Sequence, residues 1–482
     1  MNSGRRLAIG TFVMSAGNLI KAVLQLLLLP VMARLLGPAE FGIYALAMPV
    51  IQFMLMLADG GLGQSLAREP EDNWRIWSSA FWLLLASSVV LALMVVGSSF
   101  VMAALTAQPR LPPIMAALSA CLIVFVVAVP SNARLLRQGR MEIGPIGDIL
   151  ATATGAGVAI MLAVRGFGAW SLVGQTLIMF VIRTIVAVVA APVVPRLYLS
   201  FRGLSDHLAM GGSVVGIKLA DTGDRMIENS VIGRSFGSAT LGSFSFAIQI
   251  VRFACESLSN ALWAALYIRS VHAPSAEQRH RDYLRVFRII AVLLFPAAFI
   301  GAGAARNIIV LLLGAKWAGA VPLVEFYLPS YAICVAGTLG SAVLYAGGRT
   351  AIQFRINVEA AGLRIAGVMA IAWIGMTAFA AWIAVTNLYT FVRSVRATCQ
   401  YLGAAPRSVY ATGWRPLACA AAAGVFCRVA TGYAKADIVS TLAIVAIAGA
   451  IYLLLLAITD RTAFRSDCAQ IMQFVAKRAH RA

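Results

Sequence analysis

Long apolar runs recur along the whole chain, separated by short stretches that carry most of its polar residues. Each run has about 18 residues or more, enough to cross the hydrocarbon core of a bilayer as a helix. The pattern predicts an all-α polytopic membrane protein. Its fourteen helices are expected at about residues 7–33, 41–64, 77–106, 111–133, 144–164, 167–191, 208–233, 239–267, 284–304, 319–345, 352–375, 376–392, 414–432 and 438–459. The longest polar connection, 269–285, is too short for a soluble domain.

Composition agrees with a membrane protein. The chain is 61% hydrophobic and 12% charged over 482 residues, which is too little charge to cover a soluble protein of that size. Its basic start precedes an apolar run that is too long for a signal peptide and contains Lys21, so a first membrane helix is expected there. The seven cysteines have no metal-ligand spacing and are expected to be buried hydrophobic residues.

The distribution of positive charge predicts the orientation. With both termini in the cytoplasm, 25 of the 39 Lys and Arg residues fall on inner segments, 8 on outer segments and 6 inside spans. This asymmetry is the one that membrane insertion favours, and it explains the net charge of +20 without a nucleic-acid partner. It also requires residues 208–233 to cross the membrane, which places the charges of that segment inside the bilayer.

A repeat of 200 residues divides the chain. Residues 33–53 align without a gap with 233–253, and the identical pairs are Arg34/Arg234, Gly37/Gly237, Ala39/Ala239, Gly42/Gly242, Ala47/Ala247 and Phe53/Phe253. A recurring helix–turn solution is the alternative to duplication. Duplication predicts an N-terminal lobe at 1–200, a C-terminal lobe at 201–400, and helices 13 and 14 with a cytoplasmic tail at 401–482. Parallel repeats of this kind surround a central cavity in transporters.

Three predicted helices carry a polar stripe on one face. The seventh has Lys218, Asp221, Arg225 and Glu228, with Asp224 at the edge; the first has Thr11, Ser15, Asn18, Lys21 and Gln25; the eighth has Ser245, Gln249, Arg252, Glu256 and Asn260. Each charge facing lipid would cost about 2.5–3.5 kcal/mol, so the stripes are expected to face protein or water. Ion pairs that only join the lobes are one explanation. A hydrated cavity whose cations suit an anionic substrate is the favoured one.

Other charged residues within the spans give weaker signals. Asp148 near the inner end of its helix, and Arg183 in the next helix, are compatible with an interfacial position or with the cavity. Glu359 and Arg364 are five residues apart and share no face. No phosphate-binding loop, HExxH sequence or nucleophile elbow is found, so neither an enzyme nor a cofactor is predicted. Transport would then be driven by H⁺, Na⁺, the membrane potential or the gradient of the substrate.

The stretch "MARLLGPAEFGIYALAMPVIQFMLMLADGGLGQSLAR", at 32–68, resembles the N-terminal signature of bacterial polysaccharide-biosynthesis flippases. The resemblance continues at 224–247 and 312–329 and is to the Wzx-type members of the multidrug/oligosaccharidyl-lipid/polysaccharide exporter superfamily. It implies two six-helix lobes with two further helices. It also implies a polyprenyl-pyrophosphate-linked oligosaccharide, such as a lipopolysaccharide, O-antigen or exopolysaccharide repeat unit, as the substrate that is moved to the outer leaflet by alternating access.

The resemblance also implies roles for single residues. Those expected to bind pyrophosphate or acidic sugars, or to line the cavity, are Lys21, Lys218, Arg225, Arg252, Asn18, Gln25 and Gln249. Those expected to form salt bridges or carry a coupling ion are Asp221, Asp224, Glu228 and Glu256. Those expected to have structural or gating roles are Arg34, Gly37, Gly42, Asp59 and Gly63.

The same resemblance implies a bacterial cytoplasmic (inner) membrane protein. Its partners would be membrane lipids and the polymerase and chain-length proteins of the same pathway. A multidrug cation antiporter is an alternative, but it would favour an acidic, aromatic cavity. A peptidoglycan-precursor flippase is a closer alternative. A membrane-embedded polymerase or ligase is disfavoured, because no sizeable extramembrane loop is predicted.

Overall fold

The computed structural model describes residues 17, 20–21, 23–25, 27–59, 66, 74–140, 142–198, 200, 205–371, 374–434 and 437–460. Within the helix that begins at Ser205, only the backbone is described as far as residue 227. Some predicted site residues therefore lie outside the described residues, and their roles stay predictions. These are Asn18 and Gly63, together with the side chains of Lys218, Asp221, Asp224 and Arg225.

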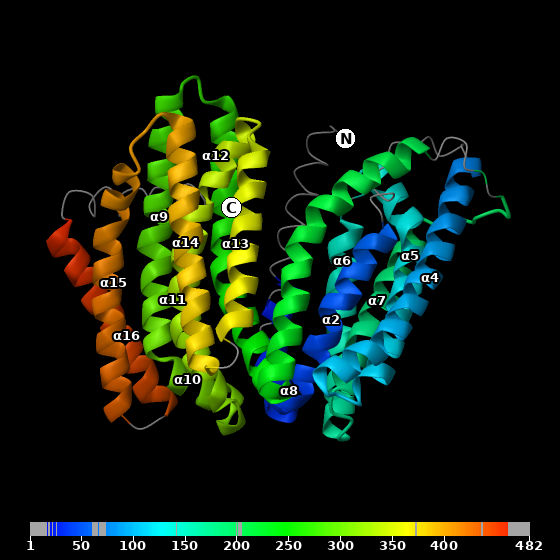
Figure 1. Ribbon diagram of the computed structural model, residues 1–482, viewed down its shortest axis with the longest axis horizontal. Coiled ribbons are helices and arrows are strands. Elements are labelled where there is room, and N and C mark those ends of the chain that lie inside the picture. The colour runs from blue at the N-terminus through cyan, green and yellow to red at the C-terminus, as the bar shows by residue number, and fades with distance from the viewer. Residues whose placement is uncertain are drawn as a thin grey trace. The chain divides into compact units, whose positions relative to one another are not determined.

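The predicted all-α membrane class is confirmed, since the described residues form helices and no strand. Nine helical segments within them are long and apolar enough to cross a membrane, so the chain is a multi-pass membrane protein. The exact number of fourteen stays a prediction. The first compact unit, Met1–Ser245, contains α2 (Pro38–Asp59), α4 (Trp74–Thr106), α5 (Leu111–Arg137), α6 (Ile143–Val164), α7 (Trp170–Ala190) and the first part of α8 (Ser205–His272) (Figure 1).

In the first unit, α5 packs against α2, α4 and α7. The face that α4 buries is a stripe of small residues, Ser88, Ala92, Val95 and Ser99, at the spacing of one helical face. Small side chains let membrane helices approach closely, and the hydroxyls of Ser88 and Ser99 are satisfied by backbone carbonyls one turn back. The opposite face exposes large apolar side chains such as Leu93, as a lipid-facing surface requires.

The helix α8 consists of two helices joined at Gly237, whose φ of 82° is open to glycine but not to residues with a Cβ. The turn predicted between helices 7 and 8 is therefore present. Before this turn, the Asn229 side chain donates to the carbonyl of Ala45 on α2 at 2.8 Å, and Arg234 donates to the carbonyl of Leu105 at 2.7 Å. These bonds join the first part of α8 to α2 and α4.

Glu40 joins three helix ends in the first unit. Its carboxylate accepts two bonds from Arg110, at 2.8 and 3.1 Å, and one from the backbone N–H of Ala169, at 2.6 Å. Arg110 lies just before α5 and Ala169 just before α7. An anion at a helix N-terminus is favoured by the free N–H groups and the helix dipole. The carboxylate also raises the pKa of Arg110 above its ordinary value, through the hydrogen bonds and the charge.

The second unit, Phe246–Ala482, contains the rest of α8 and the remaining helices. These are α9 (Ala276–Gly303), α10 (Ala305–Leu313), the 3₁₀ helix η1 (Ala315–Ala320), α11 (Val321–Thr338), α12 (Gly340–Ala346), α13 (Thr350–Ile371), α14 (Met376–Leu402), α15 (Arg407–Tyr433) and α16 (Ile438–Thr459). Here α9 lies beside α15 and α11, and α11 beside α14 (Figure 1). An aromatic row links them, with Phe287 on α9 stacked 6.4 Å from Phe391 on α14, which lies 6.0 Å from Tyr410 on α15.

Several predicted helix boundaries in the second unit are wrong. The polar segment 269–285 is mostly helical, because Ser275 caps α9 by accepting from the backbone N–H of Gln278. The expected single helix at 319–345 is divided into η1, α11 and α12. The division between α11 and α12 lies where Gly337 and Gly340 approach α14 so closely that a Cβ on either would overlap Phe391 or Thr398. Finally, α14 extends ten residues beyond the expected end, to Leu402.

Candidate functional site

Asp148 lies at the centre of an ion-pair cluster in the first unit. Its carboxylate oxygens lie 2.5 Å from the ammonium nitrogen of Lys21 and 2.7 Å from the Nε of Arg183. Asp148 is in the second turn of α6 and Arg183 in the last third of α7. Because α6 and α7 pack side by side in opposite directions, the start of one helix faces the end of the other. The three side chains are 25%, 26% and 34% exposed, so each is partly withdrawn from the surface.

A cavity of about 120 Å³ adjoins this cluster. It is lined by Asn132 of α5, Gly144, Gly147 and Asp148 of α6, and Arg183 of α7. A Cβ on Gly144 would meet no other atom within 4 Å, whereas one on Gly147 would come within 3.3 Å of Val186. With about 30 Å³ for each liquid water, the cavity accepts a few waters or one phosphate-sized anion, and it is too small for a sugar chain.

Among the residues that the structure describes, the cluster carries a surplus positive charge, because two cations share one carboxylate. A charge withdrawn from water is costly unless it is paired, so the second cation attracts a further anion. Guanidinium binds phosphate and carboxylate groups through fixed N–H donors. The arrangement is therefore suited to holding an anionic group at the edge of the cavity.

A second polar cluster lies on α8 and α11 in the second unit. The predicted (i, i+4) pair is present, with Arg252 Nε 2.8 Å from Glu256 Oε1. The same oxygen accepts a bond of 2.6 Å from the Tyr331 hydroxyl, and Tyr331 is stacked on Tyr327 with ring centres 5.1 Å apart. Glu256 is therefore held by a cation and a phenol, an environment in which a proton on the carboxylate would change both contacts.

The remaining predicted residues that the structure describes lie as follows. Gln25 and Gln249 are exposed, Arg34 is exposed, Glu228 is buried, Gly42 is tightly packed, Asp59 is half-buried, and Gly37 lies in the turn before α2. The roles assigned to these residues stay predictions. No group of three His, Cys, Asp or Glu side chains that could bind a metal occurs in the described part of the chain.

Sequence reasoning gave Asp148 and Arg183 only weak signals and did not assign a partner to Glu359. Glu359 on α13 forms two bonds of 2.9 Å with Arg393 on α14 and accepts a third, of 3.1 Å, from the Tyr389 hydroxyl. The partner of Glu359 lies on the next helix and not on its own. The available signal was that α13 and α14 are consecutive helices joined by a short connection, which makes them neighbours.

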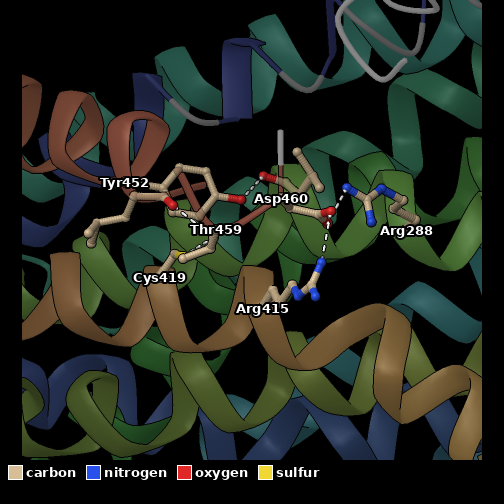
Figure 2. A network of polar contacts seen from close by, with 8 residues as sticks. Arg288, Arg415, Cys419, Tyr452, Thr459 and Asp460 are labelled. Carbon is tan, nitrogen blue, oxygen red and sulfur yellow. Dashed lines mark hydrogen bonds and ion pairs between the residues drawn. The ribbon is translucent and has the colours of Figure 1, made fainter. Parts of the chain in front are cut away.

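A further network in the second unit is centred on a buried carboxylate that two arginines hold (Figure 2). Asp460, at the end of α16, accepts from Arg288 of α9 at 2.9 Å and from Arg415 of α15 at 3.0 Å. Nearby, the Tyr452 hydroxyl donates to the carbonyl of Val292 at 3.0 Å. Asp460 is only 6% exposed and each of its carboxylate oxygens is taken by an arginine. We interpret this network as a structural connection that joins α16 to α9 and α15.

Known proteins resemble this chain in sequence. The model of the family described as "Polysaccharide biosynthesis protein" matches residues 31–322. The chain is 24% identical over 303 residues to the succinoglycan biosynthesis transport protein ExoT of Rhizobium meliloti (strain 1021), with 62% of this chain and 61% of that protein covered. It is 21% identical over 348 residues to the lipopolysaccharide biosynthesis protein WzxC of Escherichia coli (strain K12), with 70% and 69% covered. The match thus spans about three fifths of the length of ExoT.

Among solved structures, the inward closed conformation of the lipid II flippase MurJ has a TM-score of 0.77 with this chain. It is 9% identical, and the match covers 94% of this chain and 99% of MurJ. At this identity the likeness shows a shared fold alone.

Proposed function

Since the chain belongs to the polysaccharide biosynthesis protein family, we propose that it is a flippase for a polyprenyl-pyrophosphate-linked oligosaccharide. It takes the lipid-linked repeat unit of a polysaccharide from the inner to the outer leaflet and is not an enzyme. The proposed location is the bacterial cytoplasmic (inner) membrane, with both termini in the cytoplasm. The names of ExoT and WzxC, which refer to succinoglycan transport and lipopolysaccharide biosynthesis, support this substrate class.

The observation that carries the proposal is the cluster of Lys21, Asp148 and Arg183 beside a small cavity. A pyrophosphate has several negative charges and must exchange water for other donors when it enters the membrane. Two cations that share one carboxylate offer such donors. The cavity has room for a phosphate group but not for sugars, so the sugar chain would lie outside it.

The energy source is also part of the proposal. No nucleotide-binding motif occurs in the sequence, so transport is proposed to be coupled to H⁺ or Na⁺. Glu256, which is held by Arg252 and Tyr331, suits this role, because its bonds to these two side chains would change when it gained a proton. The proposed partners, besides membrane lipids, are the polymerase and chain-length proteins of the same pathway.

The experiment is a transport assay with the purified chain in liposomes. A fluorescent polyprenyl-pyrophosphate-linked oligosaccharide is added to the inner leaflet, and its arrival outside is measured. Arg183→Gln is expected to slow transport about tenfold or more, because the remaining cation is neutralised by Asp148. Arg165→Gln removes the same charge from an exposed position at the end of α6 and is the matched control.

The outcome of this assay separates the competing functions. Equal transport by Arg183→Gln and Arg165→Gln would exclude the cluster from substrate binding. Transport of a lipid-linked peptidoglycan precursor in preference to the oligosaccharide would assign the chain to that other class of polyprenyl-pyrophosphate. Export of an organic cation with neither lipid moved would assign it to the antiporters. Elongation of the sugar chain would show a polymerase.

A further inference from the structure

A cavity of about 400 Å³ lies in the second unit between the start of α13 and the last turns of α14. It is separate from the cluster around Asp148, which belongs to the first unit. Three arginines line it, Arg349 just before α13, Arg355 in its second turn and Arg393 on α14. Gln400 and Tyr401 complete the polar wall. Its volume lies within the range of about 300–1,000 Å³ that is typical of ligand pockets.

The positive charge of this cavity is only partly neutralised. Arg393 is held by Glu359 through two bonds of 2.9 Å, which leaves that guanidinium in a fixed position. Arg349 and Arg355 are exposed, and neither has an ion pair with any residue that the structure describes. Three guanidinium groups against one carboxylate attract an anion with more than one negative charge.

The backbone adds further donors. The α13 helix begins at Thr350, so its first N–H groups lie beside Arg349, and a helix N-terminus favours an anion. The preceding turn depends on Gly348, with a φ of 70°, and on a bond of 2.8 Å from the Arg349 N–H to the carbonyl of Leu344. This turn places Arg349 in the lining of the cavity.

Tyr401 is positioned by two neighbours. Gly347 has no side chain, and a Cβ there would overlap the Tyr401 hydroxyl, so the phenol fits closely against the turn. Arg279 of α9 donates to the same hydroxyl at 3.4 Å. The hydroxyl that accepts from Arg279 keeps its own proton to donate. Because Tyr401 lines the cavity, the guanidinium of Arg279 is a fourth positive charge beside the site.

We propose that this cavity, defined by Arg349, Arg355 and Arg393, binds a phosphate-bearing anion at the membrane boundary. Residues 393–402 of α14 extend beyond the apolar stretch that was expected to cross the bilayer, so the cavity lies at the depth of lipid headgroups. By the positive-inside distribution, this boundary is the cytoplasmic one. The phosphate belongs either to an anionic phospholipid or to a water-soluble diphosphate. This site does not depend on the proposed transport function.

The test compares binding by the full chain in neutral nanodiscs. The probes are short-chain phosphatidylglycerol, short-chain phosphatidylcholine and inorganic pyrophosphate, and binding is followed by native mass spectrometry and by the shift in thermal unfolding. Arg349→Gln/Arg355→Gln removes two exposed charges that have no ion pair among the described residues, so the fold is expected to persist. Arg285→Gln/Arg407→Gln removes two exposed charges from the same predicted side of the membrane and is the matched control.

The expected result is that the wild-type chain and the control bind phosphatidylglycerol or pyrophosphate but not phosphatidylcholine, and that Arg349→Gln/Arg355→Gln binds about tenfold more weakly or worse. Binding of phosphatidylglycerol that pyrophosphate does not displace identifies a lipid headgroup as the ligand, and binding of pyrophosphate alone identifies a soluble diphosphate. Equal binding of both probes by the double variant and its control overturns the proposal. Tight binding of phosphatidylcholine by the wild-type chain also overturns it.

Discussion

Gly42 and Gly242, which are 200 residues apart, pack against each other reciprocally. A Cβ on Gly42 would overlap the carbonyl of Ser238, and a Cβ on Gly242 would overlap the carbonyl of Pro38 and come within 2.8 Å of the Gly42 nitrogen. Pro38 and Ser238 are also 200 residues apart. Each residue therefore makes the same contact as its repeat counterpart, which is the relationship that a local twofold axis produces. Position 42 requires a glycine, because the backbone there is in direct contact with the backbone at Ser238.

Adding a methyl group at this contact is expected to destabilise the first unit. Gly42→Ala and Gly242→Ala each force a Cβ against a backbone carbonyl, which cannot rotate away, and overpacking of this kind costs about 1–3 kcal/mol. The apparent Tm in detergent should fall by several degrees for each variant. Gly97→Ala is the control, since Gly97 lies on α4 with open space around it. If Gly42→Ala and Gly97→Ala melt alike, the close contact does not exist in the protein.

Glu40 is expected to contribute more through Ala169 than through Arg110. The pair with Arg110 is largely exposed, with the guanidinium 54% accessible, and exposed pairs contribute about 0–1 kcal/mol. The bond to the Ala169 N–H satisfies a donor at a helix N-terminus, where loss of the acceptor costs about 1 kcal/mol. Glu40→Ala should therefore lower thermal stability more than Arg110→Gln does. Equal losses in the two variants would contradict this order.

The Asp460 network predicts how much stability is lost when each of its members is replaced. Asp460→Asn removes the carboxylate that pairs with Arg288, which is 17% exposed, and loss of a buried ion pair is costly. Arg288→Gln should destabilise the chain more than Arg415→Gln, because Arg415 is 43% exposed and water can replace its partner. Hydrogen exchange should report this as faster exchange in α16. Unchanged protection of α16 in Asp460→Asn would show that the helix is held by apolar contacts alone.

Glu256 is the described residue through which ion coupling can be tested. Glu256→Gln removes the group that would gain and lose a proton and weakens the bonds to Arg252 and Tyr331. Transport of the lipid-linked oligosaccharide by this variant is expected to become insensitive to an imposed pH or Na⁺ gradient, while some exchange between leaflets persists. Glu277→Gln, at an exposed position near the start of α9, is the matched control. A normal gradient response in Glu256→Gln would remove Glu256 from the coupling mechanism.

The sequence predicted the helices closely where the local pattern is strong. Expected spans at 111–133, 144–164, 167–191 and 438–459 begin and end within four residues of α5, α6, α7 and α16. The division at residues 337–340 was missed, because it results from contact with Phe391 and Thr398 on another helix. The ten residues added to α14 were missed because a polar helix outside the bilayer has no hydrophobicity signal.

Ion pairs, too, were predictable only where both partners lie on one helix. The Arg252–Glu256 pair was predictable because both residues lie on one helix four residues apart. Lys21 and Asp148 are 127 residues apart, and Glu359 and Arg393 are 34 apart. Their partners depend on which helices become neighbours, and no periodicity within a helix contains that information.

The sequence by itself determined that this chain spans a membrane and where most of its helices lie. Those properties follow from local hydrophobicity, because the free energy of inserting a helix is a sum over its own residues. Only the tertiary structure decided that Asp148 joins Lys21 to Arg183 and that three arginines line one cavity between α13 and α14. Such pairings depend on the packing of side chains between distant segments, and that packing decides which charge is neutralised and which is left to bind an anion.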